Sequence, residues 1–251
     1  MMRLSRRNLL GLLSGGAIVA ACSENAATGR RQFVLVSEED LAALGEEAWR
    51  DALSQLPRVE NRRMEERLAR IGERVVAASD VQVASWQFAV FDNPAINAFV
   101  LPGGKVGFCR GLMEAAASDD EIAAVVGHEV AHVAARHAAE RLSQQLALQV
   151  GVSLASAALS EEYGQNADII AGALGAGALY GVILPYSRMQ EFEADRLGVD
   201  LMRRAEFDPA GALSFWRRMA SGGEDAIEWM STHLADQTRL EALQTLIADR
   251  G

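Results

Sequence analysis

The chain has few residues that can form a disulfide or hold a soft metal ion. Of its 251 residues, two are cysteines, Cys22 and Cys109, and four are histidines. Two cysteines exclude a disulfide framework and a four-cysteine zinc site. Cys109 is expected to be a small buried apolar residue, because nothing in the sequence pairs it with a general base. His128, His132 and His137 fall within one short segment, so chemistry is expected there first.

Positive charge and long apolar runs are also scarce. The chain carries 24 Lys and Arg against 34 Asp and Glu, a net charge of −10. It is therefore a poor nucleic-acid binder, because phosphates must be met by excess Lys and Arg. Two apolar stretches, 146–159 and 169–184, are shorter than the roughly 20 residues that span a bilayer. We expect a buried helical hairpin at about 146–184, and a hairpin that dips into a membrane is the alternative.

Residues 1–21 have the composition of a signal peptide. Three arginines precede an apolar stretch that ends in Val-Ala-Ala-Cys at Cys22, which resembles a bacterial lipobox. The Arg-Arg pair also resembles a twin-arginine export signal, with general secretion as the alternative. We expect lipidation of Cys22, a lipidated tether over 22–36 and a lipid-anchored protein that faces the periplasm of a bacterial cell envelope. Ser23 weakly favours the outer membrane, because an aspartate there resembles an inner-membrane retention signal.

Residues 37–251 are expected to form a single domain of mainly helical α+β class with one small sheet. The composition, 50% hydrophobic and 23% charged, is that of a globular chain. Aromatic and β-branched residues, separated by turn signals, predict strands at 86–91, 96–101 and 105–108. Apolar residues at helical spacing and capping signals predict helices at 38–56, 60–78, 118–149, 187–204, 209–220 and near the C-terminus.

The H-E-x-x-H pattern lies inside the helix that is predicted to start at Ser118. His128 and His132 are four residues apart, so their imidazoles share one helix face and can share one zinc ion. Glu129 lies about 100° round the helix and can reach water on that ion without being a ligand. A chance match is the alternative, but the helix-cap signal and the use of two of only four histidines argue against it.

A catalytic zinc site needs a third protein ligand. The metzincin spacing fails, because alanines occupy the required positions and His137 is one residue off and on the wrong helix face. A thermolysin-like spacing also fails, since no carboxylate lies about 20 residues after the motif. Glu191 and Asp195 share a helix face, whereas Glu193 points roughly opposite. Glu191 is the candidate zinc ligand and Asp195 the candidate acceptor of a hydrogen bond from a liganding histidine. An ordinary solvated acidic face is the alternative.

These motifs together resemble the zinc metallopeptidases of the CAAX-prenyl-protease and HtpX type, the gluzincins of metallopeptidase family forty-eight. More narrowly, the chain resembles their bacterial lipoprotein branch. The resemblance covers about residues 28–245 and is carried by the segments 28–31, 97–104, 127–133, 187–195 and 231–233. It implies a zincin-type domain in which the edge strand of the sheet flanks the HExxH helix. It also implies one zinc ion held by His128, His132 and Glu191, with Glu129 as the catalytic residue.

The same resemblance implies auxiliary residues. His233 and Arg239 resemble a pair that stabilises the tetrahedral intermediate, or His233 caps the zinc at rest. A plain surface histidine is the alternative for His233, and Leu234 stands where the family usually has proline. An extended substrate would bind an edge strand through its backbone, although the strand could be structural only. That strand would contain Asn97, Ala98, Phe99 and Val100.

The expected function is that of a zinc metalloendopeptidase with Glu129 as general base. Its expected partners are unfolded or misfolded envelope proteins, which it would hydrolyse, and the membrane that holds its lipid. An envelope chaperone or assembly factor that uses the fold for binding only is the alternative. A binding module has no need of Glu129, which stands here beside a full ligand set. The short hairpin and the export signal disfavour a membrane-embedded protease.

Overall fold

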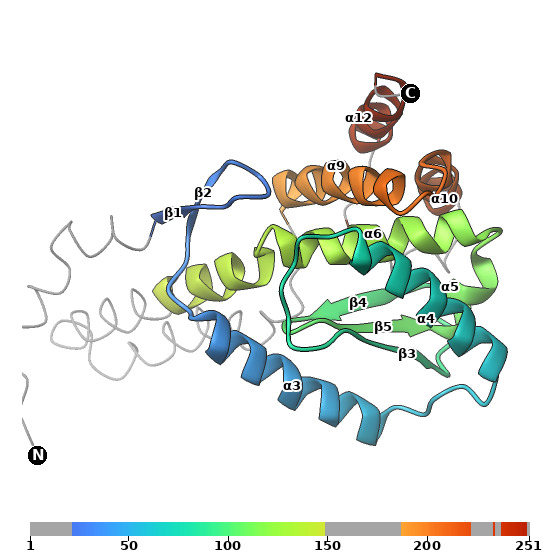
Figure 1. The fold of residues 1–251 in the computed structure, drawn as a ribbon, viewed down its shortest axis with the longest axis horizontal. Helices are drawn as coiled ribbons and strands as arrows, with labels where there is room; N and C mark the ends of the chain where they lie inside the picture. The colour runs from blue at the N-terminus through green and yellow to red at the C-terminus, as the bar shows by residue number, and fades with distance from the viewer. Residues whose placement is uncertain (1–21, 149–186, 222–232, 234–236, 250–251) are drawn as a thin grey trace, which may run out of the picture. The chain divides into compact units, whose positions relative to one another are not determined.

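The computed structural model describes residues 22–148, 187–221, 233 and 237–249 (Figure 1). The predicted signal peptide at 1–21, and the predicted hairpin from residue 149 onward, lie outside the described residues. None of the helices in the described part is both long enough and apolar enough to cross a membrane.

The chain divides into two compact units, each described here by itself. The first unit contains Met1–Ser37 and Ala139–Val182, and the second contains Glu38–Ala138 and Ile183–Gly251. Every residue of the candidate site belongs to the second unit.

The helices of the second unit begin where the sequence provides caps. The Ser118 side chain accepts a hydrogen bond from the backbone of Glu121 at 3.2 Å, and Ser187 forms a full capping box with Gln190. The expected helices are confirmed to within two residues at their starts, and the short α5 was not expected. The helices are α3 (Glu38–Gln55), α4 (Arg62–Ala77), α5 (Arg110–Ala115), α6 (Asp119–Ala134), α9 (Arg188–Arg204), α10 (Ala210–Ser221) and α12 (Gln237–Ala248).

One helix prediction was wrong, because the helix expected over 118–149 is interrupted. The α6 helix ends at Ala134, and Arg136 adopts a left-handed backbone with φ of 53°. Residues 137–148 are helical again. Arg136 forms an ion pair with Glu38, which holds the turn. Neither proline nor glycine marks the break, so sequence pattern offered no signal for it.

A three-stranded sheet lies against α6. Its strands are β3 (Gln87–Phe91), β4 (Ala98–Leu101) and β5 (Lys105–Cys109), in the order β3-β5-β4. The central β5 pairs parallel with β3 and antiparallel with β4. The β4–β5 turn needs Gly103 and Gly104, whose φ values of 80° and 83° suit glycine.

The predicted fold class is confirmed by this arrangement. Figure 1 shows α6 between the sheet and α9, and α6 contacts both α9 and the edge strand β4. A single large apolar core joins the helices to the sheet, with residues such as Leu68, Val90, Phe108, Val125 and Phe215 fully buried. The domain is therefore a mainly helical α+β fold whose edge strand flanks the HExxH helix.

The first unit contains a short hairpin in the segment expected to be a tether. The strands β1 (Cys22–Glu24) and β2 (Arg31–Phe33) pair antiparallel. Arg30 binds both carboxylate oxygens of Glu140, each at 2.7 Å. The two nitrogens of one guanidinium fit the two oxygens of one carboxylate, so this contact fixes the hairpin within its unit.

Candidate metal centre

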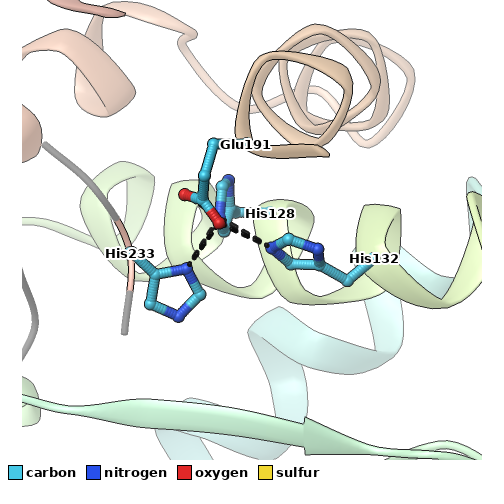
Figure 2. Close-up of side chains that lie close together, drawn as sticks. All are labelled: His128, His132, Glu191 and His233. Atoms are coloured by element: carbon cyan, nitrogen blue, oxygen red, sulfur yellow. Dashed lines mark hydrogen bonds and ion pairs between the residues drawn. The ribbon is translucent and has the colours of Figure 1, made fainter. Parts of the chain in front are cut away.

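Three histidines and one glutamate converge on a single buried point (Figure 2). His128 and His132 come from α6, Glu191 comes from the first turn of α9, and His233 joins them. None of the four is more than 2% exposed, and each offers a ligand atom within 4.8 Å of the others. The structure thus brings the three predicted zinc ligands together and adds His233 to the same group.

The distances between these atoms fit a tetrahedral zinc site. The two Nε2 atoms of His128 and His132 are 3.1 Å apart. Glu191 Oε2 lies 3.4 Å from His128 Nε2, and Glu191 Oε1 lies 3.5 Å from His132 Nε2. Zinc bonds of about 2.0–2.1 Å at tetrahedral angles place neighbouring ligand atoms about 3.3 Å apart. His233 Nδ1, at 3.2 Å from His128 Nε2 and 3.3 Å from Glu191, has the same spacing.

The chemistry of the donor atoms also fits zinc. His128 and His132 both use Nδ1 for a hydrogen bond to another side chain, so their Nε2 atoms remain to face each other. Two imidazole nitrogens and a carboxylate are the ligand set of known catalytic zinc sites, and here they lie within 3.5 Å of one another. The residues present therefore fit the metal that the H-E-x-x-H pattern implies.

Glu129 lies beside this point, as the motif predicts. It is 1% exposed, and its carboxylate accepts a hydrogen bond from the backbone N–H of Val100 on β4. Its Oε1 atom is 3.4 Å from His233 Nε2 and has no hydrogen-bond partner among the described residues. Burial raises the pKa of Glu129. This carboxylate is therefore suited to accept and hold a proton.

Asp195 holds one of the predicted ligands, as the shared helix face suggested. Its Oδ1 atom lies 3.0 Å from His128 Nδ1 and accepts a hydrogen bond from Trp216 Nε1 at 3.1 Å. Burial lowers the pKa of His128, but the charge of Glu191 and the hydrogen bond to Asp195 outweigh burial and raise it to about 9. The hydrogen bond to Asp195 keeps a proton on His128 Nδ1, so Nε2 is the nitrogen that would bind a metal.

Arg239 is a buried cation that binds two carboxylates of the site. Its Nη1 atom is 2.5 Å from Glu191, and its Nη2 atom donates to Asp195 at 2.7 Å. Burial alone would raise the pKa of both acids, but Arg239 outweighs it and holds the pKa of Asp195 low and that of Glu191 well below its usual range. Sequence reasoning paired Arg239 with His233 and did not place these contacts.

Two residues that the sequence set aside also reach the site. His137 was placed on the wrong helix face and Glu193 opposite Glu191, yet both form hydrogen bonds in a chain that starts at His132. The interruption of α6 at Arg136 brings His137 there, and His137 in turn meets Glu193 of α9.

Among the described residues, the predicted substrate-binding strand is the edge strand of the sheet. Cys109 donates its backbone N–H to the carbonyl of Asn97 at 2.9 Å. Hydrogen bonding alternates along an antiparallel pair, so Ala98 and Val100 turn their backbone groups away from β5. The side chain of Phe99 packs against Phe91, with the ring centroids 5.9 Å apart. The strand therefore presents backbone groups beside Glu129.

The chain resembles known peptidases over most of its length. Residues 62–247 match the family model described as Peptidase family M48. The chain is 34% identical over 225 residues to the mitochondrial metalloendopeptidase OMA1 of Schizosaccharomyces pombe, which covers 86% of this chain and 64% of that protein. Human OMA1 is 29% identical over 228 residues, 87% of this chain and 43% of the relative.

A bacterial relative is similar over a shorter stretch. The β-barrel assembly-enhancing protease of Yersinia pestis is 30% identical over 179 residues, 68% of this chain and 36% of the relative. The chain thus spans less than two thirds of the length of each of these relatives.

Proposed function

This chain belongs to peptidase family M48, and we propose that it is a zinc-dependent metalloendopeptidase acting on unfolded or misfolded envelope proteins. The observation that carries the proposal is the convergence of His128, His132 and Glu191 at the spacing of zinc ligands. Glu129 stands next to them with a buried carboxylate, as hydrolysis requires and simple binding does not.

Three residues would hold the metal, and a fourth would move the proton. His128, His132 and Glu191 would bind zinc, which supplies a Lewis acid that acidifies water and polarises a carbonyl. Glu129 takes a proton as water attacks the scissile carbonyl and gives it to the leaving amine. Its raised pKa favours that transfer, as does its Oε1 atom, which accepts no hydrogen bond within the described part of the chain.

His233 and Arg239 take different roles in this proposal. Arg239 acts through Glu191 and Asp195, whose charges it balances and whose orientation it fixes. His233 Nδ1 lies 3.2 Å from His128 Nε2, so it could also contact the metal, and its Nε2 lies 3.4 Å from Glu129 Oε1. A His233→Gln variant separates its two candidate roles. Lower turnover with zinc retained supports stabilisation of the oxyanion, whereas higher turnover supports a cap at rest.

The position of β4 at the edge of the described sheet supports substrates in extended form. A peptide can pair with the outward backbone groups of Ala98 and with the carbonyl of Val100. Such pairing reads the backbone rather than particular side chains, so it favours unfolded segments of varied sequence. Folded proteins offer few free extended segments and are expected to be poor substrates.

Within the family, we place the chain in the bacterial lipoprotein branch rather than among the mitochondrial relatives. The support is the lipobox-like sequence that ends at Cys22. The protein would be held by a lipid on Cys22, facing the periplasm and with the outer membrane favoured. Palmitate labelling that disappears in Cys22→Ser would support this, and equal labelling of both would contradict it.

An envelope chaperone or assembly factor is the second candidate function. It is favoured by the similarity to a β-barrel assembly-enhancing protease. Here the fold would bind client proteins without cutting them. Glu129 favours hydrolysis over binding alone, because a protein that only binds its clients does not need this carboxylate.

The deciding experiment compares unfolded and folded substrates. Purified chain with measured zinc content is incubated with casein and with a compact folded protein, each with and without a zinc chelator. Cleavage of casein alone, abolished by the chelator and restored by added zinc, supports the proposal. Zinc binding without cleavage of either substrate would support the chaperone function, and absence of bound zinc would contradict the metal site.

A further inference from the structure

A chain of hydrogen bonds leads away from His132, on the side opposite its Nε2 atom. His132 Nδ1 lies 2.8 Å from Nδ1 of His137, and His137 Nε2 lies 2.9 Å from an oxygen of Glu193. His137 is fully buried, and the Glu193 side chain is 14% exposed. A buried histidine between an expected zinc ligand and a carboxylate is thus part of the structure.

The protons in this chain have one consistent arrangement. If His132 binds metal through Nε2, its Nδ1 carries the proton and donates it to His137 Nδ1. His137 then carries its own proton on Nε2 and donates to Glu193. Both imidazoles are neutral in this arrangement, and every polar atom along the chain has its partner. The carboxylate of Glu193 therefore selects the tautomer of His132 through His137.

The fold builds this contact with a local distortion. On an uninterrupted helix, His137 would lie about 140° round from His132 and could not meet it. The left-handed residue Arg136, with φ of 53°, ends α6 and turns the next residue back toward the site. A left-handed backbone at a residue other than glycine is strained, and such strain tends to occur at functional sites.

Side chains of helix α9 support both histidine ligands through hydrogen bonds that lead to their Nδ1 atoms. Asp195 contacts His128 directly at 3.0 Å, and Glu193 reaches His132 through His137. The carboxylate of Glu191 lies near the Nε2 atoms of both histidines, the atoms that would bind the metal. One short acidic segment therefore provides a ligand and two outer supports.

We propose that His137 and Glu193 are positioning residues that orient the zinc ligand His132, as Asp195 orients His128. They touch neither substrate nor metal and act only through His132 Nδ1. Partners of this kind are worth about 10–100-fold in metal affinity. The inference rests on the proposed zinc site, and its test therefore measures metal affinity rather than activity alone.

The test is the zinc dissociation constant of the full chain, measured by competition with a chelating dye. His137→Phe keeps the ring volume and removes both nitrogens, and it should raise the constant by about 10–100-fold. In His137→Asn the amide oxygen can replace Nδ1, so affinity should return to within about threefold of wild type. Glu193→Leu should weaken binding, and Glu193→Gln, which keeps an acceptor for His137, should weaken it less.

Two further measurements separate positioning from general damage to the fold. Glu66→Gln is the matched control for lost charge, since Glu66 pairs with Arg62 on the exposed surface of α4 and should leave zinc affinity unchanged. The visible absorption of the Co²⁺-loaded protein reports ligand geometry, and it should change in His137→Phe and recover in His137→Asn. If His137→Phe does not fold, the Asn and Leu variants carry the test.

The outcomes are distinct for this inference and for the proposed function. Wild-type protein that binds no zinc would reject the proposed zinc site itself. Wild-type binding, with equal affinity and an unchanged cobalt spectrum in the His137 and Glu193 variants, would reject only the positioning role. Weaker binding in both His137→Phe and Glu193→Leu, with recovery in His137→Asn, would support it.

Discussion

Gly127 on α6 and Gly198 on α9 face each other so closely that a side chain on either would press against the backbone of the other helix. A Cβ atom on Gly198 would lie 3.1 Å from both the carbonyl carbon of Gly127 and the backbone nitrogen of His128. A Cβ atom on Gly127 would lie 3.1 Å from the carbonyl oxygen of Gly198. These contacts are with backbone, which cannot rotate away as a side chain can. The two glycines therefore set how closely the helix with the histidines approaches the helix with Glu191.

Enlarging this contact should damage the metal site without changing a ligand. Gly198→Val is expected to lower zinc affinity at least about tenfold and to cost about 1–3 kcal/mol of stability through overpacking. Ala210→Val, at an exposed residue of α10, is the control for a β-branched residue in a helix. Zinc titration and thermal unfolding measure the two effects. Wild-type zinc affinity in Gly198→Val would show that the helix spacing does not set the ligand geometry.

The role of β4 as a substrate-binding edge can be tested with a single proline. Ala98→Pro removes an outward N–H and leaves the bond between Asn97 and Cys109 in place. We expect KM for casein to rise several-fold with kcat little changed, because the loss is in substrate binding rather than chemistry. Steady-state kinetics, with zinc content and thermal unfolding as controls for the fold, measure this. An unchanged KM would mean that β4 does not bind the substrate and has a structural role only.

The capping glutamate of α6 gives the domain a pH-dependent stability. Glu121 is 3% exposed and accepts hydrogen bonds from Ser214 Oγ and the backbone of Ala117, each at 2.7 Å, and from Arg218. Burial alone would raise its pKa, but these donors outweigh burial and lower it from the ordinary 4.5. A lowered folded-state pKa means stabilisation above the unfolded value, which is lost as pH falls through the folded value.

The corresponding variant is Glu121→Gln in the zinc-free protein. Near neutral pH we expect its free energy of unfolding to be about 1–3 kcal/mol lower than that of wild type, because charged hydrogen bonds are lost. The difference should shrink as pH falls below 4.5, since wild-type Glu121 then becomes protonated. Denaturant titrations over that range measure it. A difference that stays constant with pH would mean that the charge of Glu121 contributes nothing.

The part of the site that could be predicted from sequence rests on regular helices. His128 and His132 share a face because they are four residues apart, and Glu191 and Asp195 do so for the same reason. The resemblance to a known family then joined the two helices. These predictions concern the relative placement of residues within one helix, which spacing determines.

The part that could not be predicted depends on departures from regularity and on contacts between distant segments. The interruption at Arg136 has no glycine or proline to signal it, so the contact of His137 with His132 had no signal in the sequence. Glu193 was expected to point away from the site, and its partner comes into reach only through that interruption. The contacts of Arg239 with Glu191 and Asp195 join α12 to α9, and no local pattern encodes them.

Glu129 is proposed to perform hydrolysis at a zinc site made by His128, His132 and Glu191. The most direct measurement is casein hydrolysis and zinc content for wild type and Glu129→Gln side by side. We expect about one zinc per chain in both proteins, and a loss of at least about 100-fold in turnover in the variant alone. Equal turnover in the two proteins, or a wild type that binds no zinc, would contradict the account.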